Sequence, residues 1–166
     1  MRKMLAFTAF LTLVITLACQ PQTEEAEEVA AIEPAAEEQA VAEVLDDYMN
    51  AVELEDMDYY ASVVDQSLDN VFIGAGADGY VTGWDALAAL MEAQNEAFSD
   101  TKITQSDLKT HLLPDGKTAW ATSLWDLAAT VGEQQIQLPV RCTWILEKRD
   151  GEWKIVHFHK SVGMQK

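Results

Sequence analysis

The chain has 166 residues, of which 49% are hydrophobic, and it carries a formal net charge of −17. Its length accommodates one domain with short appendages, and its apolar fraction is sufficient for a buried core. The acidic excess excludes nucleic acid as a partner, because the protein would repel the phosphates that it must neutralise. Anionic membrane surfaces would repel it as well, so we expect membrane attachment only through a covalent anchor.

The first segment, MRKMLAFTAFLTLVITLAC, has the pattern of an export signal. Arg2 and Lys3 precede an apolar run that ends at Ala18 and is shorter than the roughly 20 residues that span a bilayer. The ending TLAC resembles the lipobox of bacterial lipoproteins. This resemblance implies a signal peptide at 1–18, lipidation of Cys19 and attachment to the bacterial envelope. Gln20 after the cysteine favours the periplasmic side of the outer membrane. Ordinary secretion after cleavage nearby is the alternative.

The segment that follows, QPQTEEAEEVAAIEPAA, contains no aromatic residue. It cannot bury enough apolar surface to offset its chain entropy, so we expect residues 19–36 to form a lipidated cysteine and a disordered acidic tether. With Cys19 lipidated, Cys142 is the only other cysteine, and no intramolecular disulfide is expected. The folded domain is predicted to occupy residues 37–166.

Helical patterns dominate the first part of this domain. Val41, Leu45, Tyr48 and Val52 recur at helical spacing and predict an amphipathic helix from about Glu37. Asp56 is predicted to cap a second, short helix in DMDYYASVV. A short strand is expected at 68–74, and a third helix from about Trp84 to Phe98, with Trp84, Leu87, Met91 and Phe98 on its apolar stripe.

Strand patterns follow from Thr101. Four runs, ITQSDLKTHLL, TAWATSLWDLAATV, IQLPVRCTWILEK and EWKIVHFHKSV, are separated by turn residues. Helices followed by a meander of long strands indicate an α+β domain, in which one curved antiparallel sheet wraps around the helices.

This order of elements resembles the nuclear transport factor 2-like superfamily, also called SnoaL-like. The ending RDGEWKIVHFHKSVG is most similar to the closing hairpin of the association domain of calcium/calmodulin-dependent protein kinase II and its bacterial relatives. The resemblance implies a cone-shaped, cystatin-like roll with a pocket inside and a homodimer formed through the outer face of the sheet. At two positions where those association domains carry pocket arginines, this chain has Trp144 and Lys160.

His157 and His159 lie two residues apart on the last predicted strand and should therefore share a face with Trp153, Ile155 and Ser161. The pair could supply two metal ligands, but a catalytic zinc needs a third protein ligand. We therefore expect no metal or other cofactor, and we interpret the histidines as lining the sheet wall.

The residues opposite the histidines depend on the turn. A two-residue loop at Asp150-Gly151 pairs Trp153 with Lys148 and sets His157 opposite Trp144. If Arg149 joins the loop, Arg141, Thr143 and Ile145 come to the histidine face instead. The first register is slightly favoured, because it leaves the cleaner apolar face.

The sequence GAGADG, residues 74–79, matches the glycine pattern of dinucleotide-binding loops. Such a loop should open a helix within a βαβ unit, whereas YVTG follows here. We interpret it as a loop at the mouth of the cone.

Seven residues are candidates for the lining of a pocket in the cone: Tyr48, Trp84, Trp125, Asp126, Trp144, His157 and His159. An aromatic cavity with few polar groups is typical of a small-molecule site. The favoured function is therefore a non-catalytic module that binds a small organic ligand or serves in assembly, and no catalytic residue is assigned. The alternative is an acid–base enzyme, an isomerase, dehydratase or hydrolase, that uses Asp126 with a histidine.

Overall fold

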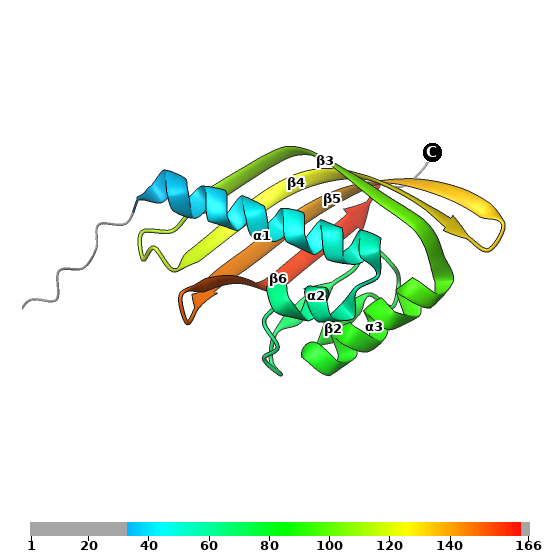
Figure 1. Ribbon diagram of the computed structural model, residues 1–166, viewed down its shortest axis with the longest axis horizontal. Coiled ribbons are helices and arrows are strands. Elements are labelled where there is room, and N and C mark those ends of the chain that lie inside the picture. Colours follow the sequence, from blue (N-terminus) through cyan, green and yellow to red (C-terminus); the bar gives the residue numbers. More distant parts are fainter. Residues whose placement is uncertain (1–32, 164–166) are drawn as a thin grey trace, which may run out of the picture. The chain divides into compact units, whose positions relative to one another are not determined.

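Helices come first and long strands follow in the computed structural model, which describes residues 33–163 (Figure 1). The helices are α1 (Pro34–Leu54), α2 (Met57–Val63) and α3 (Trp84–Ala97). The strands are β1 (Val71–Ile73), β2 (Tyr80–Thr82), β3 (Phe98–Leu112), β4 (Thr118–Val131), β5 (Gln134–Arg149) and β6 (Glu152–Val162). The predicted signal peptide, Cys19 and most of the predicted tether lie outside the described residues. No helix in the described part is long and apolar enough to cross a membrane.

The strands form one sheet in the order β2-β1-β6-β5-β4-β3, and α1 lies across its concave side (Figure 1). Strands β3 to β6 make the predicted antiparallel meander. The short β1, however, pairs in parallel with β6, so the sheet is mixed rather than wholly antiparallel. The prediction of an α+β fold with one curved sheet around N-terminal helices is confirmed.

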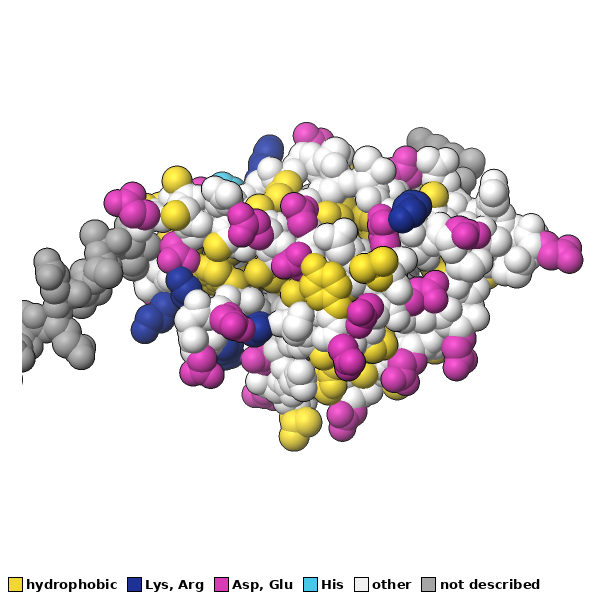
Figure 2. Space-filling view, in the orientation of Figure 1, with side chains coloured by type: hydrophobic (Ala, Val, Ile, Leu, Met, Phe, Trp, Pro, Cys, Tyr) yellow, Lys and Arg dark blue, Asp and Glu magenta, His cyan; other side chains and the backbone are white. Residues whose placement is uncertain are grey.

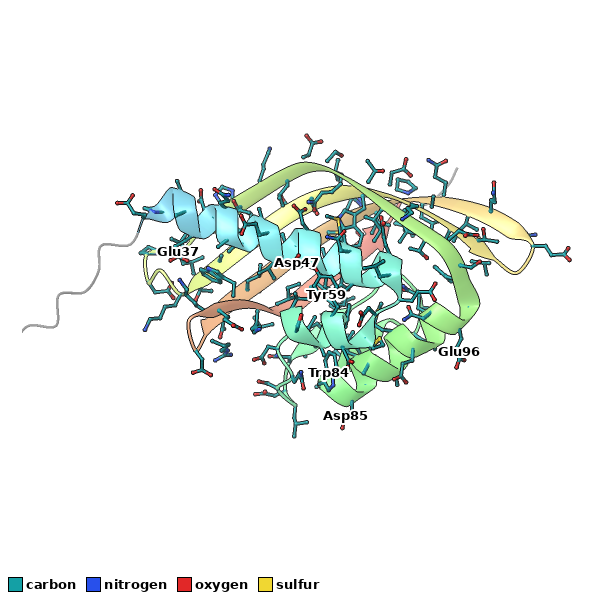
Figure 3. The ribbon with its side chains drawn as sticks, viewed as in Figure 1. Glu37, Asp47, Tyr59, Trp84, Asp85 and Glu96 are labelled. Atoms are coloured by element: carbon teal, nitrogen blue, oxygen red, sulfur yellow. The ribbon has the colours of Figure 1, made fainter. Side chains whose placement is uncertain are left out.

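Helix α1 packs its predicted stripe against the sheet. Val41, Leu45 and Tyr48 are fully buried, while acidic side chains cover the outward surface of the helices (Figure 2). Asp56 caps α2 as predicted, because its Oδ1 accepts a hydrogen bond of 2.9 Å from the Tyr59 backbone N–H. Between the two helices the Tyr59 hydroxyl donates to Asp47 at 2.6 Å, and both residues are labelled in Figure 3.

Acidic side chains also attach α1 to the sheet at both ends. Near the start of the helix, the Glu37 carboxylate accepts hydrogen bonds from Lys148 Nζ at 2.7 Å and Trp153 Nε1 at 2.8 Å. Near its end, Glu53 accepts from the Ile103 backbone N–H at 2.6 Å and from Lys102 Nζ at 2.8 Å. Residues 31–166 form a compact unit with a buried core of its own, so we expect this fragment to fold without the N-terminal segment.

A bulge in β6 determines which residues face the helices. The two-residue loop at Asp150 and Gly151 forms as favoured, both residues have positive φ, and Lys148 pairs with Trp153. The register holds as far as Leu146 opposite Ile155, but the next pair is Ile145 with His157, which leaves Val156 as an extra residue.

The prediction that His157 lies opposite Trp144 is therefore wrong, because Phe158 takes that position. The bulge occurs where β6 changes neighbours. Val64 and Asp65 bridge to Ile155 on one side of it, and β1 pairs with β6 from Phe158 on the other. Beyond the bulge, Phe158 and the alternate residues after it point toward the helices, while His157 and His159 point to the outer face.

Candidate functional site

A cluster of aromatic side chains fills the interior of the cone. Tyr48 from α1 lies at its centre, with ring centroids 4.9 Å from Tyr60, 5.1 Å from Trp144 and 5.9 Å from Phe158. Trp125 is 5.4 Å from Trp144. All five side chains are buried, so helices and sheet are joined by aromatic contacts at this level.

Lys160 points into this cluster. Its Nζ lies 4.5 Å from the ring centroids of Tyr48 and Phe158, 4.7 Å from that of Trp125 and 5.4 Å from that of Trp144. It donates a hydrogen bond of 2.7 Å to the Tyr48 hydroxyl. Among residues 33–163 no carboxylate forms a salt bridge with it. Burial disfavours the charged ammonium and lowers the pKa of Lys160 to about 8.

Sequence reasoning missed the inward position of Lys160. Without the bulge at Val156, strand alternation would send Lys160 to the outer face together with Phe158. The one signal in the sequence was its match to an arginine position of the related association domains. That match indicated a charge but not its surroundings.

The other ionisable groups beside Lys160 remain uncharged. The hydroxyls of Tyr48 and Tyr60 are 2.9 Å apart, and burial raises the pKa of both phenols. Cys142 pairs directly with Lys160 across β5 and β6, and burial raises the pKa of its thiol to about 11. Ser123 accepts a hydrogen bond of 3.3 Å from Trp144 Nε1. The ammonium of Lys160 is therefore the only charge in this layer of the described cone.

A cavity of about 510 Å³ opens at the mouth of the cone. Its lining is mostly apolar and comes from α3, the sheet and the 74–79 loop, including Leu90, Ala93, Phe98, Leu127, Leu138, Val140 and Val162. The 74–79 loop joins β1 to β2, and no helix follows it directly. Its place at the cavity agrees with its interpretation as a loop at the mouth of the cone. Gly74 N–H donates to Gly79 O at 2.8 Å, and a Cβ on Gly79 would lie 2.8 Å from the carbonyl oxygen of Gly74. Only glycine fits there without a shift.

Strand geometry places Lys160 next to the inner end of this cavity. Val162, Val140 and Leu127 line the cavity on three neighbouring strands. Two residues further into the cone on β5 and β6 stand Cys142 and Lys160, which pair with each other. Trp125 on β4 pairs with Val140 and therefore lies level with the cavity lining. Because alternate residues on a strand are roughly 6.5 Å apart, Cys142 and Lys160 form the layer directly behind the cavity lining.

The predicted site residues separate into two groups. Tyr48, Trp125 and Trp144 come together inside the cone. Trp84, labelled in Figure 3, is half-buried at the start of α3 and stacks on Tyr60 with a centroid distance of 6.1 Å. These four residues belong to the aromatic interior or its edge.

Asp126, His157 and His159 do not lie in the cone, which corrects their predicted placement. Asp126 is exposed on the outer face, because its neighbour Trp125 points inward, and its Oδ2 accepts a hydrogen bond of 2.8 Å from Gln137. His157 is half-buried, with Nδ1 2.6 Å from the Val71 carbonyl oxygen, and His159 is exposed. The cone therefore holds no Asp126–histidine pair.

Within 33–163 no three His, Cys, Asp or Glu side chains are grouped to hold a metal ion.

A curved sheet closed by N-terminal helices, with a cavity at its mouth, defines the nuclear transport factor 2-like and cystatin-like class of folds. Residues 41–165 match the model of the SnoaL-like domain, and the chain belongs to this family. No curated protein matches the chain at a significant level.

Solved structures share the fold at low sequence identity. A nuclear transport factor 2-like superfamily protein from Salmonella enterica superposes with a TM-score of 0.72 at 20% identity, covering 80% of this chain and 94% of that one. A provisionally assigned dehydratase from Streptomyces avermitilis gives 0.71 at 13% identity, with 80% and 100% covered. A provisionally assigned calcium/calmodulin-dependent protein kinase II association domain from Xanthomonas campestris gives 0.65 at 20%, with 76% and 87% covered. Identities this low show the fold alone.

Proposed function

We propose that this SnoaL-like domain is a non-catalytic binding module that takes a small, largely apolar organic molecule into the mouth cavity. The observation that carries the proposal is the cavity itself. Its volume of about 510 Å³ and mostly apolar lining match the sites that hold small molecules in other proteins. The aromatic cluster behind it, which also holds Lys160, adds few polar groups to the inner end of the cavity.

The residues proposed for an acid–base enzyme, Asp126 and a histidine, do not line the cavity. General acid–base chemistry needs a titratable group within reach of the bound substrate. Asp126 is exposed on the opposite side of the sheet from the cavity, and the two histidines share that outer face. The provisionally assigned dehydratase among the structural neighbours has this fold at 13% identity and does not restore a pair.

A neutral fluorescent probe tests the binding proposal. N-phenyl-1-naphthylamine should bind the 31–166 fragment with a saturable increase in emission. Ala93→Phe should weaken binding by roughly tenfold or more, because the added ring occupies the cavity and overpacking costs ~1–3 kcal/mol. Ala89→Phe is the matched control, since Ala89 is exposed on the same helix and does not line the cavity. Equal binding by both variants would contradict the proposal.

We also propose that the outer face of the sheet binds a second copy of the chain. Three large apolar side chains are exposed there: Trp120 at 40%, Leu124 at 43% and Ile145 at 37%. Trp120 pairs with Ile145 across β4 and β5, and its ring stacks on His111 at 4.1 Å. Exposed large apolar side chains gathered on one face of a sheet are typical of an interface.

Charge favours a copy of this chain as the occupant. The sequence has no Lys or Arg between Met4 and Thr101, so its acidic excess falls largely on the helices (Figure 2). The outer face instead carries Lys109 and Arg141 beside Asp126. Two such faces meet without the repulsion expected between the acidic surfaces of two copies.

Sedimentation equilibrium tests the dimer. Trp120→Glu on the outer face should convert a dimer of the 31–166 fragment into a monomer. Leu68→Glu is the control, because Leu68 is 78% exposed but lies outside the sheet. A wild-type fragment that stays monomeric at high concentration would contradict this proposal.

For its location, we propose a lipoprotein held in the bacterial envelope through Cys19. The support is the sequence alone, in the apolar segment and the TLAC ending. The helical start at Pro34 leaves the residues between Cys19 and that proline as the link to the domain.

A further inference from the structure

We propose that Lys160 makes the mouth cavity selective for apolar molecules that carry a carboxylate. The inference rests on the proposed binding function and names the chemical class of its ligand. The acidic group would enter first and accept hydrogen bonds from the Lys160 ammonium, while the apolar body stays among the side chains that line the cavity.

The partners of Lys160 distinguish it from other lysines of the domain. Lys102, Lys148 and Lys154 each lie within 2.8 Å of a carboxylate oxygen. Lys160 instead donates to one neutral hydroxyl and is surrounded by four aromatic rings. An ammonium has three N–H donors, and the rings offer only their faces to the remaining ones. A ligand carboxylate would supply the acceptor that this part of the domain does not provide.

Position gives Lys160 access to the cavity. It precedes Val162, which lines the cavity, by two residues on the same face of β6. The residue is half-buried, and its four-carbon stem allows the ammonium to turn from the Tyr48 hydroxyl toward the cavity. The opening lies at the loop and α3, so a bound molecule would lie between solvent and Lys160.

The remaining charges around the site orient a carboxylate inward. From α1 and α2 the neutral hydroxyls of Tyr48 and Tyr60 face the lysine, and from β5 the neutral thiol of Cys142 does. Of the carboxylates in the described part of the chain, Asp78 alone lines the cavity, and it is exposed in the loop at the rim. It would repel an acidic group that remained at the entrance. The more distant acidic residues act weakly, because salt screens exposed charges beyond about 8 Å.

Competition between two ligands of the same skeleton tests the inference. 2-Naphthoate and 2-naphthalenemethanol would each displace N-phenyl-1-naphthylamine from the 31–166 fragment at pH 6.5. The acid should bind roughly tenfold or more tightly than the alcohol, because hydrogen bonds to charged groups contribute about 1.5–3 kcal/mol. Lys160→Met, which replaces the ammonium with an uncharged side chain, should abolish this preference. Lys109→Met removes an exposed lysine and should keep the preference.

A pH series on the wild-type fragment gives a readout that needs no variant. Affinity for the naphthoate should fall as pH rises from 7 to 9.5, because the ammonium that binds it loses its proton over this range. Affinity for the alcohol should stay constant.

Equal affinities of acid and alcohol for the wild-type fragment would overturn the inference and leave the binding function in place. Failure of the neutral probe to bind would overturn both. A preference for acid that persists in Lys160→Met would also overturn the role of this lysine.

Discussion

Lys160 is held by four aromatic rings and one hydroxyl group, and no carboxylate of residues 33–163 pairs with it. Cation–π contacts offset part of the free energy needed to remove the ammonium from water. The lowered pKa shows that this compensation is incomplete, since burial still favours the neutral amine. A partly desolvated ammonium without a carboxylate partner attracts any anion that reaches it. We therefore propose that Lys160 determines the chemical class of the ligand.

The lowered pKa of Lys160 predicts how the stability of the domain depends on pH. Between pH 8 and 10.5 the unfolded chain keeps a proton on this lysine that the folded chain has lost, so the contribution of Lys160 to stability rises with pH over this window. We expect the free energy of unfolding of the wild-type fragment, minus that of Lys160→Met, to increase from pH 8 to pH 10. Urea unfolding at several pH values measures it.

Taking the difference cancels the buried Tyr48, Tyr60 and Cys142, whose raised pKa values act in the opposite direction at high pH. Lys109→Met is the control and should give no such slope. A flat difference for Lys160→Met would show that its ammonium is solvated.

At the scale of elements, the 74–79 loop shapes the mouth of the cone. Gly79→Ala should destabilise the fragment by about 1–3 kcal/mol, because its new Cβ would lie 2.8 Å from the Gly74 carbonyl oxygen and the loop must shift. The same shift should weaken binding of N-phenyl-1-naphthylamine. Gly76→Ala in the same loop adds a Cβ that meets nothing within 4 Å, so it should change neither property. Thermal unfolding and probe titration of the two variants measure both effects.

Helix α1 is attached to the β5–β6 hairpin through Glu37. Hydrogen bonds from Lys148 and Trp153 lower the pKa of this carboxyl below its ordinary value of 4.5. Glu37→Gln should cost about 1 kcal/mol of stability at pH 7, since the pair is only partly buried. The loss should shrink as pH falls from 4.5 through the lowered pKa, because protons bind first to the unfolded chain and then to the folded carboxylate. Glu92→Gln on the exposed side of α3 should have little effect at either pH, and an equal loss there would argue for a general charge effect.

Individual elements differ in how far the sequence predicts them. Helical spacing in α1, the Asp56 cap of α2 and the Asp150-Gly151 loop are local signals, and the structure agrees with them. The bulge at Val156 and the parallel pairing of β1 with β6 are not local. They depend on which distant segment lies beside β6, and VHF contains no turn residue that would mark a bulge.

The same non-local bulge limits how much of the candidate site can be predicted from the sequence. Tyr48, Trp125 and Trp144 were identified because large aromatic residues on core-facing stripes tend to be buried together. Lys160 was missed as a pocket residue and the histidines were misplaced for one reason, since a single extra residue reverses every side chain beyond it. Asp126 could have pointed either way by alternation alone, and the larger apolar surface of Trp125 decided the direction.

At the scale of the whole molecule, we propose separate roles for the acidic surface of the helices and the outer face of the sheet. In the proposed dimer, the apolar residues of the outer face would bind a second copy, and the cavity would remain open at the mouth of each cone. The acidic helices would keep the proposed dimers apart at a membrane surface, where anionic lipids would also repel them.

Membrane attachment of the full chain should depend on Cys19. In bacterial cells, wild-type protein should sediment with membranes and incorporate labelled fatty acid, whereas Cys19→Ala should incorporate none. Cys142→Ala is the control, because Cys142 is buried in β5 and should not be lipidated. Incorporation of label by Cys19→Ala would contradict the anchor.

We propose that the mouth cavity binds an apolar carboxylate with Lys160 at its inner end. A crystal structure of the 31–166 fragment with 2-naphthoate tests it most directly. We predict the naphthalene ring among Leu138, Val140 and Val162, with a carboxylate oxygen within hydrogen-bond distance of Lys160 Nζ. Naphthoate bound only elsewhere, or with its carboxylate at the rim and Lys160 still on Tyr48, would contradict the account.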